Sequence, residues 1–95
     1  MKFMVVYSLK ASSDPGKIFE LVARRATYEF PPGMKLVAEY WTPKQVPTVV
    51  AIYEADDMMP LMLNTTTWSD GFEIDVFPVV EWEEGLEKLQ KAVSG

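Results

Sequence analysis

One stretch governs how this 95-residue chain folds: residues 48–80 read TVVAIYEADDMMPLMLNTTTWSDGFEIDVFPVV. An apolar run at 49–53 stops at a mostly acidic segment, 54–57. A Met- and Leu-rich segment follows and ends at Trp68, and an alternating run closes the stretch at Val80. Short β-rich runs on either side of a longer apolar segment with polar ends predict a strand, a helix and a strand.

The ends of this central helix are marked by residues that favour helix termini. Asp57 is the expected N-cap, because its carboxylate can accept the free backbone N–H groups of the first turn. Pro60 then lies in the first turn, where a missing N–H is tolerated. The helix should end near Thr67, since the threonines at 65–67 are poor helix formers. Pro78 restricts the strand that follows to a sheet edge, because proline cannot donate to a strand ladder.

The rest of the chain supplies more elements of the same two kinds. The expected segments are strands at 3–9, 35–42, 48–54 and 72–80, and further helices at 15–29 and 81–94. The first helix should begin at Ser12-Ser13-Asp14-Pro15, a capping residue followed by proline at the first helical position. Arg25 falls inside the apolar stripe of that helix. The first and third strands are apolar on both faces, which is typical of central strands.

The resulting order, βαββαβ with a closing helix, is the ferredoxin-like α+β arrangement, in a single domain over residues 1–95. Its first and third strands are central, and its second and fourth are edges. Both long helices cover one face of the antiparallel sheet, so the other face keeps uncovered apolar side chains. We expect a second copy of the chain to cover that face, giving a homodimer with a barrel-like interior. The closing helix is the competing cover, and it should pack at the edge or on the partner.

The charge of the chain argues against two kinds of partner. Fourteen acidic and 9 basic residues give a net charge of −5. Nucleic acid and anionic membranes both require clustered Lys and Arg, so we expect neither as a partner. The N-terminus has no secretory signal, and no stretch has the length to cross a membrane, which makes the cytoplasm the expected location.

Two residue types are missing altogether, cysteine and histidine. Thiol nucleophiles, disulfides, Cys/His zinc sites, His- or Cys-ligated haem and Ser-His-Asp triads are therefore impossible. Any proton transfer must use Asp, Glu, Lys, Tyr or water. We expect neither a cofactor nor a metal ion.

Five segments carry a resemblance to known proteins: MKFMV at 1–5, PGMKL at 32–36, YEADD at 53–57, WSD at 68–70 and FEIDVFPV at 72–79. Over about residues 1–85 the chain resembles the dimeric α/β-barrel superfamily and, within it, a domain-of-unknown-function family of small prokaryotic proteins. The superfamily includes cofactor-free monooxygenases, haem-degrading enzymes, isomerases, peroxidases and ligand sensors, so the resemblance selects no activity. The haem-degrading members fit poorly, since this chain has no histidine.

Several charged residues have two interpretations each. Glu54 is either a pocket acid whose pKa is raised by burial or an exposed carboxylate at a strand end. Asp56 and Asp57 are either metal ligands or, as we expect, residues that cap the next helix. Arg25 either binds an anionic ligand or ties its helix to the chain below through an ion pair.

The two edge strands present a further group of candidates. Glu39 and Trp41 on one strand, and Glu73, Asp75 and Phe77 on the other, fall on outward faces. In a dimer these side chains can ring a cavity with aromatic walls and acids suited to a cationic or hydroxylated ligand. The alternative is that these side chains form no cavity, and are either exposed to solvent, as in an ordinary alternating strand, or packed at the dimer contact. The residue opposite Glu39 depends on the hairpin register, which the sequence does not set.

Asn64 and Trp68 lie four residues apart, on one face of the central helix. An Asn and a Trp beside a cavity resemble the active-site residues of the cofactor-free monooxygenases. Tyr7 and Glu54 are the other candidates for proton transfer in such an enzyme. Trp68 also fits a second role, that of a large aromatic anchor in the core.

Three functions are compatible with these observations. The first is a homodimeric small-molecule-binding protein, with ligand contacts expected from Tyr7, Arg25, Glu39, Trp41, Glu54, Asn64, Trp68 and Asp75. The second is a cofactor-independent monooxygenase or isomerase, and the third is a structural assembly module. A cavity with converging polar groups favours the first two, and a strongly shifted pKa at a buried Glu or Tyr favours the enzyme.

Overall fold

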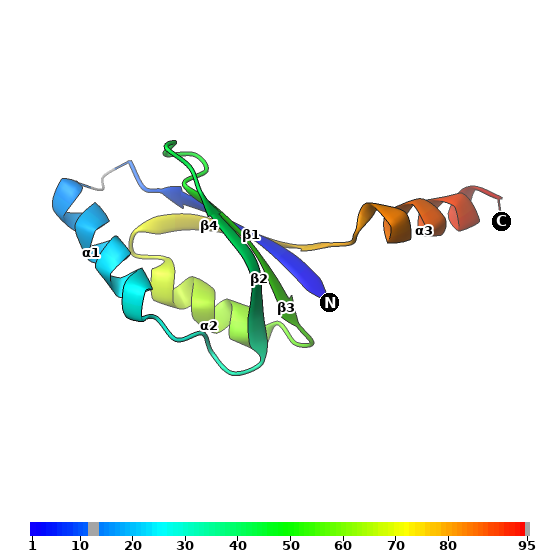
Figure 1. The fold of residues 1–95 in the computed structure, drawn as a ribbon, viewed down its shortest axis with the longest axis horizontal. Coiled ribbons are helices and arrows are strands. Elements are labelled where there is room, and N and C mark those ends of the chain that lie inside the picture. Colours follow the sequence, from blue (N-terminus) through cyan, green and yellow to red (C-terminus); the bar gives the residue numbers. More distant parts are fainter. Residues whose placement is uncertain (12–13, 95) are drawn as a thin grey trace.

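The sheet has four antiparallel strands in the order β2-β3-β1-β4. A computed structural model describes residues 1–11 and 14–94 (Figure 1). The elements are β1 (Lys2–Leu9), α1 (Pro15–Thr27), β2 (Met34–Trp41), β3 (Val49–Ala55), α2 (Met59–Trp68), β4 (Phe72–Val79) and α3 (Trp82–Ser94). This order is the ferredoxin-like arrangement, which confirms the predicted fold class and the placing of β1 and β3 at the centre.

Helix α1 begins as the sequence predicts. The side chain of Asp14 accepts the N–H of Lys17 at 2.8 Å, and Pro15 is the first helical residue. Ser12 and Ser13 of the predicted start signal lie outside the described residues. The helix is two residues shorter than predicted, because the backbone of Tyr28 is already extended.

The N-cap predicted for α2 was wrong by one residue. Met58 occupies the cap position, and its side chain makes no capping hydrogen bond. Asp57, the residue before the cap, accepts the N–H of Met59 at its Oδ1 atom, at 2.8 Å. At the other end the helix continues through the threonines to Trp68. The hydroxyls of Thr66 and Thr67 donate to carbonyls four residues back, so each finds a hydrogen-bond partner within the helix.

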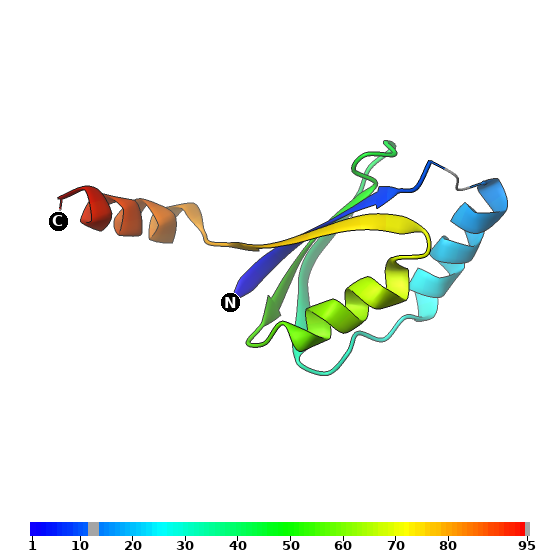
Figure 2. The same cartoon turned by 180° about the vertical axis from the view of Figure 1, so that it is seen from behind.

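The core lies between the sheet and the helices α1 and α2, which cover the same face (Figures 1 and 2). The buried side chains of the central strands are Phe3, Val5, Tyr7, Ala51, Tyr53 and Ala55. Helix α1 adds Leu21, and α2 adds Leu61, Asn64 and Trp68. The side chains on the opposite, outer face, Met4, Val6, Val50 and Ile52, are half-buried.

A β-bulge in β2 overturns one prediction about side-chain direction. The register shifts between Leu36 and Ala38, so that Glu39 pairs with Ala51 and Trp41 with Val49. These partners belong to the inner face, so Glu39 and Trp41 point toward the helices. Asp75, which pairs with Val6, stays on the outer face. The expectation that Glu39, Trp41, Glu73, Asp75 and Phe77 share the outward face is therefore wrong for Glu39 and Trp41.

Helix α3 points away from the rest of the chain (Figures 1 and 2). It extends the direction of β4 and stretches the molecule to 55 × 28 × 17 Å. Its apolar residues Trp82, Leu86, Leu89 and Val93 recur at helical spacing, and all four are exposed. Within residues 1–11 and 14–94, no helix has the length and apolar character that a membrane span requires.

Candidate functional site

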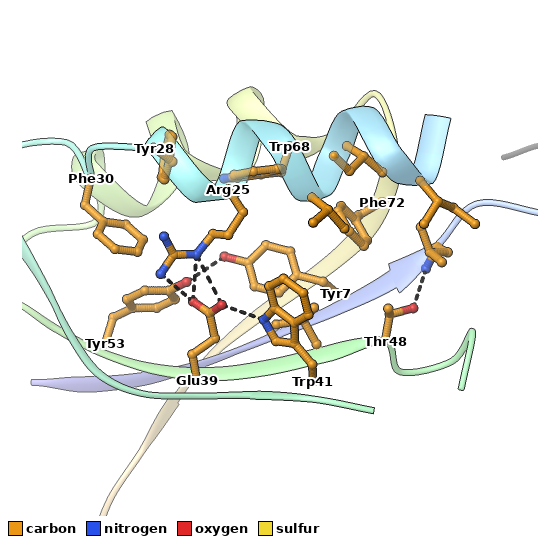
Figure 3. A pocket seen from close by; sticks show the side chains of 15 residues that line it. Tyr7, Arg25, Tyr28, Phe30, Glu39, Trp41, Thr48, Tyr53, Trp68 and Phe72 are labelled. Atoms are coloured by element: carbon orange, nitrogen blue, oxygen red, sulfur yellow. Dashed lines mark hydrogen bonds and ion pairs between the residues drawn. The ribbon is translucent and has the colours of Figure 1, made fainter. Parts of the chain in front are cut away.

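A cavity of about 90 Å³ lies between α1 and the inner face of the sheet (Figure 3). Its walls come from α1, from β1, β2 and β3, and from the adjoining ends of α2 and β4. The surface that lines it is almost entirely apolar. Ile18 and Val22 of α1 form part of this wall and remain partly exposed, so the cavity opens to solvent along the helix.

The cavity exists because α1 touches the core through few side chains. Leu21 is the one residue of this helix that is buried. It fits against Gly71, where an added Cβ would lie 2.7 Å from Leu21 Cδ1. On the outer side, Asp70 accepts from Arg24 at 3.0 Å and from Lys17 at 2.6 Å, which ties the helix to the end of α2. These contacts hold α1 at one place over the sheet and leave the space beside it open.

A charged group forms the polar end of the cavity. Arg25 Nη2 of α1 donates to Glu39 Oε1 at 3.1 Å, and Arg25 Nε lies 3.2 Å from both carboxylate oxygens. Trp41 Nε1 donates to Glu39 Oε2 at 2.7 Å. The guanidinium also lies 5.1 Å from the ring centre of Phe30. The bulge makes this group possible, because it turns Glu39 toward the helix.

A second polar group crosses the floor of the cavity. Tyr28 donates its hydroxyl to Asn64 Oδ1 at 2.9 Å, and Asn64 Nδ2 donates to the hydroxyl of Tyr7 at 2.8 Å. The hydroxyls of Tyr7 and Tyr53 are 2.9 Å apart and share one further hydrogen bond. Asn64 is only 1% exposed, and both ends of its amide are paired.

Burial keeps the two central tyrosines neutral. Desolvation raises the pKa of Tyr7, although hydrogen bonds with Tyr53 and Asn64 act in the opposite direction. Desolvation also raises the pKa of Tyr53 strongly, and the neighbouring Tyr7 raises it further. Near pH 7 both groups are therefore neutral phenols that can donate or accept hydrogen bonds, and neither supplies a phenolate base.

The family of the chain follows from its sequence match. The family described as Domain of unknown function (DUF3303) matches residues 1–93. The chain belongs to this family. No match was found among curated proteins or among solved structures. The predicted resemblance to a domain-of-unknown-function family is thereby confirmed.

In this DUF3303 chain, five of the eight predicted ligand-binding residues line the cavity. They are Tyr7, Arg25, Glu39, Trp41 and Trp68. A sixth, Asn64, lies directly behind Tyr7 and holds its hydroxyl. Of the two alternatives for Arg25, the structure contains the ion pair with the chain below.

The remaining two predicted residues lie elsewhere. Glu54 is exposed at the end of β3, where a polar hollow is formed with Lys35 and Asp56. Asp75 is exposed on the outer face of β4. Among the described residues, no cluster of three acidic side chains has the geometry to hold a metal ion.

Sequence reasoning missed Tyr28 and Tyr53, which complete the polar floor. Tyr53 occupies the same alternating face of β3 as Ala51, so its inward direction was readable from the strand pattern. Its pairing with Tyr7 was not readable, because it depends on how β1 and β3 are aligned. Tyr28 lies just past the end of α1 in a loop, where no periodic signal exists.

Proposed function

We propose that this DUF3303 protein is a homodimeric small-molecule-binding protein of the dimeric α/β-barrel superfamily. Its ligand is a small, uncharged and largely apolar molecule held in the cavity beside α1. One observation carries this proposal: an open apolar cavity in which the surrounding polar groups are already paired with one another. Among the described residues, no buried side-chain nitrogen or oxygen lacks a hydrogen-bond partner.

The internal pairing explains why the ligand is uncharged. An anion entering the cavity would compete with Glu39 for Arg25, and a cation would compete with Arg25 for Glu39. In either case one member of a partly buried pair would lose its partner, and the Glu39 side chain is only 13% exposed. Leaving one partner of a buried ion pair uncompensated is strongly unfavourable. A neutral ligand leaves the pair intact.

The size and chemistry of the walls narrow the ligand further. Dry apolar cavities of about 150 Å³ accept benzene. The present cavity measures about 90 Å³ and opens to solvent, so a single ring or short alkyl group fits with the rest of the molecule in the mouth. Aromatic rings of Tyr7, Trp41 and Phe72 line the space and favour edge-to-face contact with such a ring.

The polar floor favours binding over catalysis. A general base needs a pKa close to the working pH, whereas burial raises the pKa of Tyr7 and Tyr53 away from neutrality. Each end of the Asn64 amide already has a partner, Tyr28 at the oxygen and Tyr7 at the nitrogen. The cofactor-independent monooxygenase or isomerase is therefore the less supported alternative. A structural module without a ligand is less supported as well, because such a protein needs no open cavity.

The homodimer is supported by the outer face of the sheet. Met4 and Val6 of β1 and Val50 and Ile52 of β3 form an apolar band that neither α1 nor α2 covers. Exposed apolar bands of this kind mark interfaces on soluble proteins. A two-fold contact between two such faces would bury both bands together.

Thermal unfolding with three ligands of matched shape tests the binding proposal. Benzyl alcohol, benzoate and benzylammonium share one ring and differ in charge. With a Kd near 1 mM, benzyl alcohol at about 10 mM should stabilise the protein by about 1.4 kcal/mol and raise Tm by about 6–11 °C. The two ions should leave Tm unchanged. An equal or larger shift with either ion would refute the uncharged ligand.

A pair of variants ties the effect to the cavity. Val22→Phe places a ring in the wall from α1 and should abolish the benzyl alcohol shift. Ala23→Phe adds the same ring to an exposed position one residue further along the helix and should preserve the shift. Retention of the full shift in Val22→Phe would show that the ligand binds elsewhere.

A further inference from the structure

Helix α3 carries an apolar stripe with the spacing of a seam between two helices. Trp82, Leu86, Leu89 and Val93 follow one another at steps of four, three and four residues. Alternating steps of this kind keep a narrow stripe facing one partner helix, whereas a helix that packs on a broad core has a wider apolar face. The four side chains are 48 to 86% exposed. The spacing therefore favours another helix as the partner of this stripe.

The connection to β4 holds α3 clear of its own sheet. Val79 pairs with Lys2 in the last step of the sheet, and α3 begins three residues later, at Trp82. Between them, Glu81 accepts a hydrogen bond from Lys2 Nζ at 2.7 Å, which ties the connector to the start of β1. The helix therefore runs beyond the end of the sheet at which β1 begins (Figures 1 and 2). A second helix can lie along it without meeting the sheet.

We infer that α3 pairs with α3 of a second copy of this chain, and that the two helices are antiparallel. A two-fold axis midway between residues 87 and 88 places Leu86 level with Leu89 of the second copy, and Trp82 level with Val93. The largest side chain of the stripe then faces the smallest, and two leucines face each other. A parallel pair would instead oppose Trp82 to Trp82 and Val93 to Val93, which crowds one end of the seam and leaves the other underfilled.

The charges along α3 favour the same direction. Its first turn carries Glu83 and Glu84, and its last turn carries Lys91. In an antiparallel pair the acidic end of each helix lies beside the basic end of the other, and Glu84 is level with Lys91 of the second copy. A parallel pair would place the two acidic ends side by side, and like charges that face each other repel. With three glutamates and two lysines, the helix is also too close to neutral to oppose its own pairing.

The same charges make a membrane a poorer match for the stripe. Helices that lie on anionic membranes carry a polar face rich in Lys and Arg. The polar face of α3 has more glutamates than lysines, and the chain as a whole has a net charge of −5. A helix with its own complementary charges is therefore the better partner.

The pairing uses no residue of the cavity or of the outer sheet face, so it goes beyond the function proposed above and does not rest on it. Each helix contributes four apolar side chains, which makes the contact one of the small and transient class. Where the outer sheet faces also pair, α3 pairs link those dimers into larger assemblies.

Introduced cysteines test the direction of the pair, because the chain has none of its own. Trp82→Cys and a mass-tagged Val93→Cys are mixed in equal amounts and oxidised. Mixed disulfide-linked dimers should form, since a disulfide requires Cα atoms within about 7 Å and the antiparallel pair sets these two positions opposite each other. Like-with-like dimers should be absent, because the two copies of either position are about 16 Å apart along the helix axis.

The control mixes Lys88→Cys, on the polar side of α3, with Val93→Cys and should stay unlinked. An excess of like-with-like dimers would show a parallel pair. A statistical mixture would show collisions without a defined register, and an absence of mixed dimers would show that the helices do not meet. Each of these three results would overturn the inference.

Sedimentation supplies a second measurement, in which the wild-type chain keeps every side chain of the stripe. In a concentration series up to about 1 mM, it should show an association step that Leu86→Asp weakens by at least about 30-fold, as expected for a central apolar anchor. Lys88→Gln should leave this step within about threefold. An association that Leu86→Asp does not change, or a wild-type chain whose α3 instead binds vesicles of phosphatidylcholine and phosphatidylglycerol, would refute the pair. Leu86→Asp should retain ring binding and the outer-face dimer, so the pair and the proposed function can fail separately.

Discussion

Replacing Asn64 with leucine tests how the floor of the cavity is held together. The substitution keeps the approximate volume but removes the hydrogen bonds from Tyr28 at 2.9 Å and to Tyr7 at 2.8 Å. Each lost bond costs about 1 kcal/mol, and a buried group left without a partner adds about 1–3 kcal/mol. Tyr7 keeps its bond with Tyr53, and Tyr28 is partly exposed and can bond to water. We therefore expect a loss of about 2–4 kcal/mol in the free energy of unfolding.

Urea denaturation at one fixed protein concentration measures this loss, since the stability of a dimer depends on concentration. In thermal unfolding the same loss lowers Tm by about 8–32 °C for a domain of this size. Met62→Leu, at an exposed position of α2, serves as the control and should change stability by less than about 0.5 kcal/mol. A cycle with Tyr7→Phe should show coupling of about 1 kcal/mol. A loss below about 1 kcal/mol in Asn64→Leu would mean that the hydrogen-bond chain contributes little to stability.

Three further outcomes follow from contacts around the cavity. Ion pairs with α1 lower the pKa of Asp70, so its contribution to stability is present above about pH 4 and is lost as the pH falls below that. Because this side chain is 45% exposed, Asp70→Asn should remove less than about 1 kcal/mol of the free energy of unfolding that depends on acid pH, so Tm should fall less steeply below about pH 4. An unchanged dependence of Tm on pH would contradict a stabilising role for the Asp70 ion pairs. Gly71→Ala should cost about 1–3 kcal/mol in urea, since the new Cβ would meet Leu21 at 2.7 Å; a neutral result would mean that α1 shifts freely. Trp41→Phe should cost about 0.5–1.5 kcal/mol through the lost bond to Glu39, and no change in urea midpoint would show that water replaces it.

The layout of the fold was predictable because its signals are local or strictly periodic. Strands β1 and β3 are apolar on both faces, and Pro78 lies on an edge strand. Asp14 and Pro15 mark the start of α1 within the sequence itself. The cap of α2 was misplaced because Asp57 can serve from either of two neighbouring positions, and only the backbone path decides between them.

The composition of the site was predictable only in part. Tyr7, Arg25 and Trp68 face the core on regular elements, so their periodicity placed them correctly. Glu39 and Trp41 line the cavity, but the sequence analysis assigned them to the wrong face. A bulge arises from the alignment of two strands, and nothing local to β2 announces it. Pairings such as Arg25 with Glu39 join distant elements and therefore require the assembled structure.

The extra residue in β2 also makes the binding chamber sensitive to the register between β2 and β3. Without the bulge, Val37 would pair with Ile52, and every later residue of the strand would change face. Glu39 and Trp41 would then face outward, Arg25 would lose its counter-charge, and the polar end of the chamber would vanish without any change in its own residues. A one-residue slip in the register of β2 is thus equivalent to exchanging the whole polar corner of the chamber.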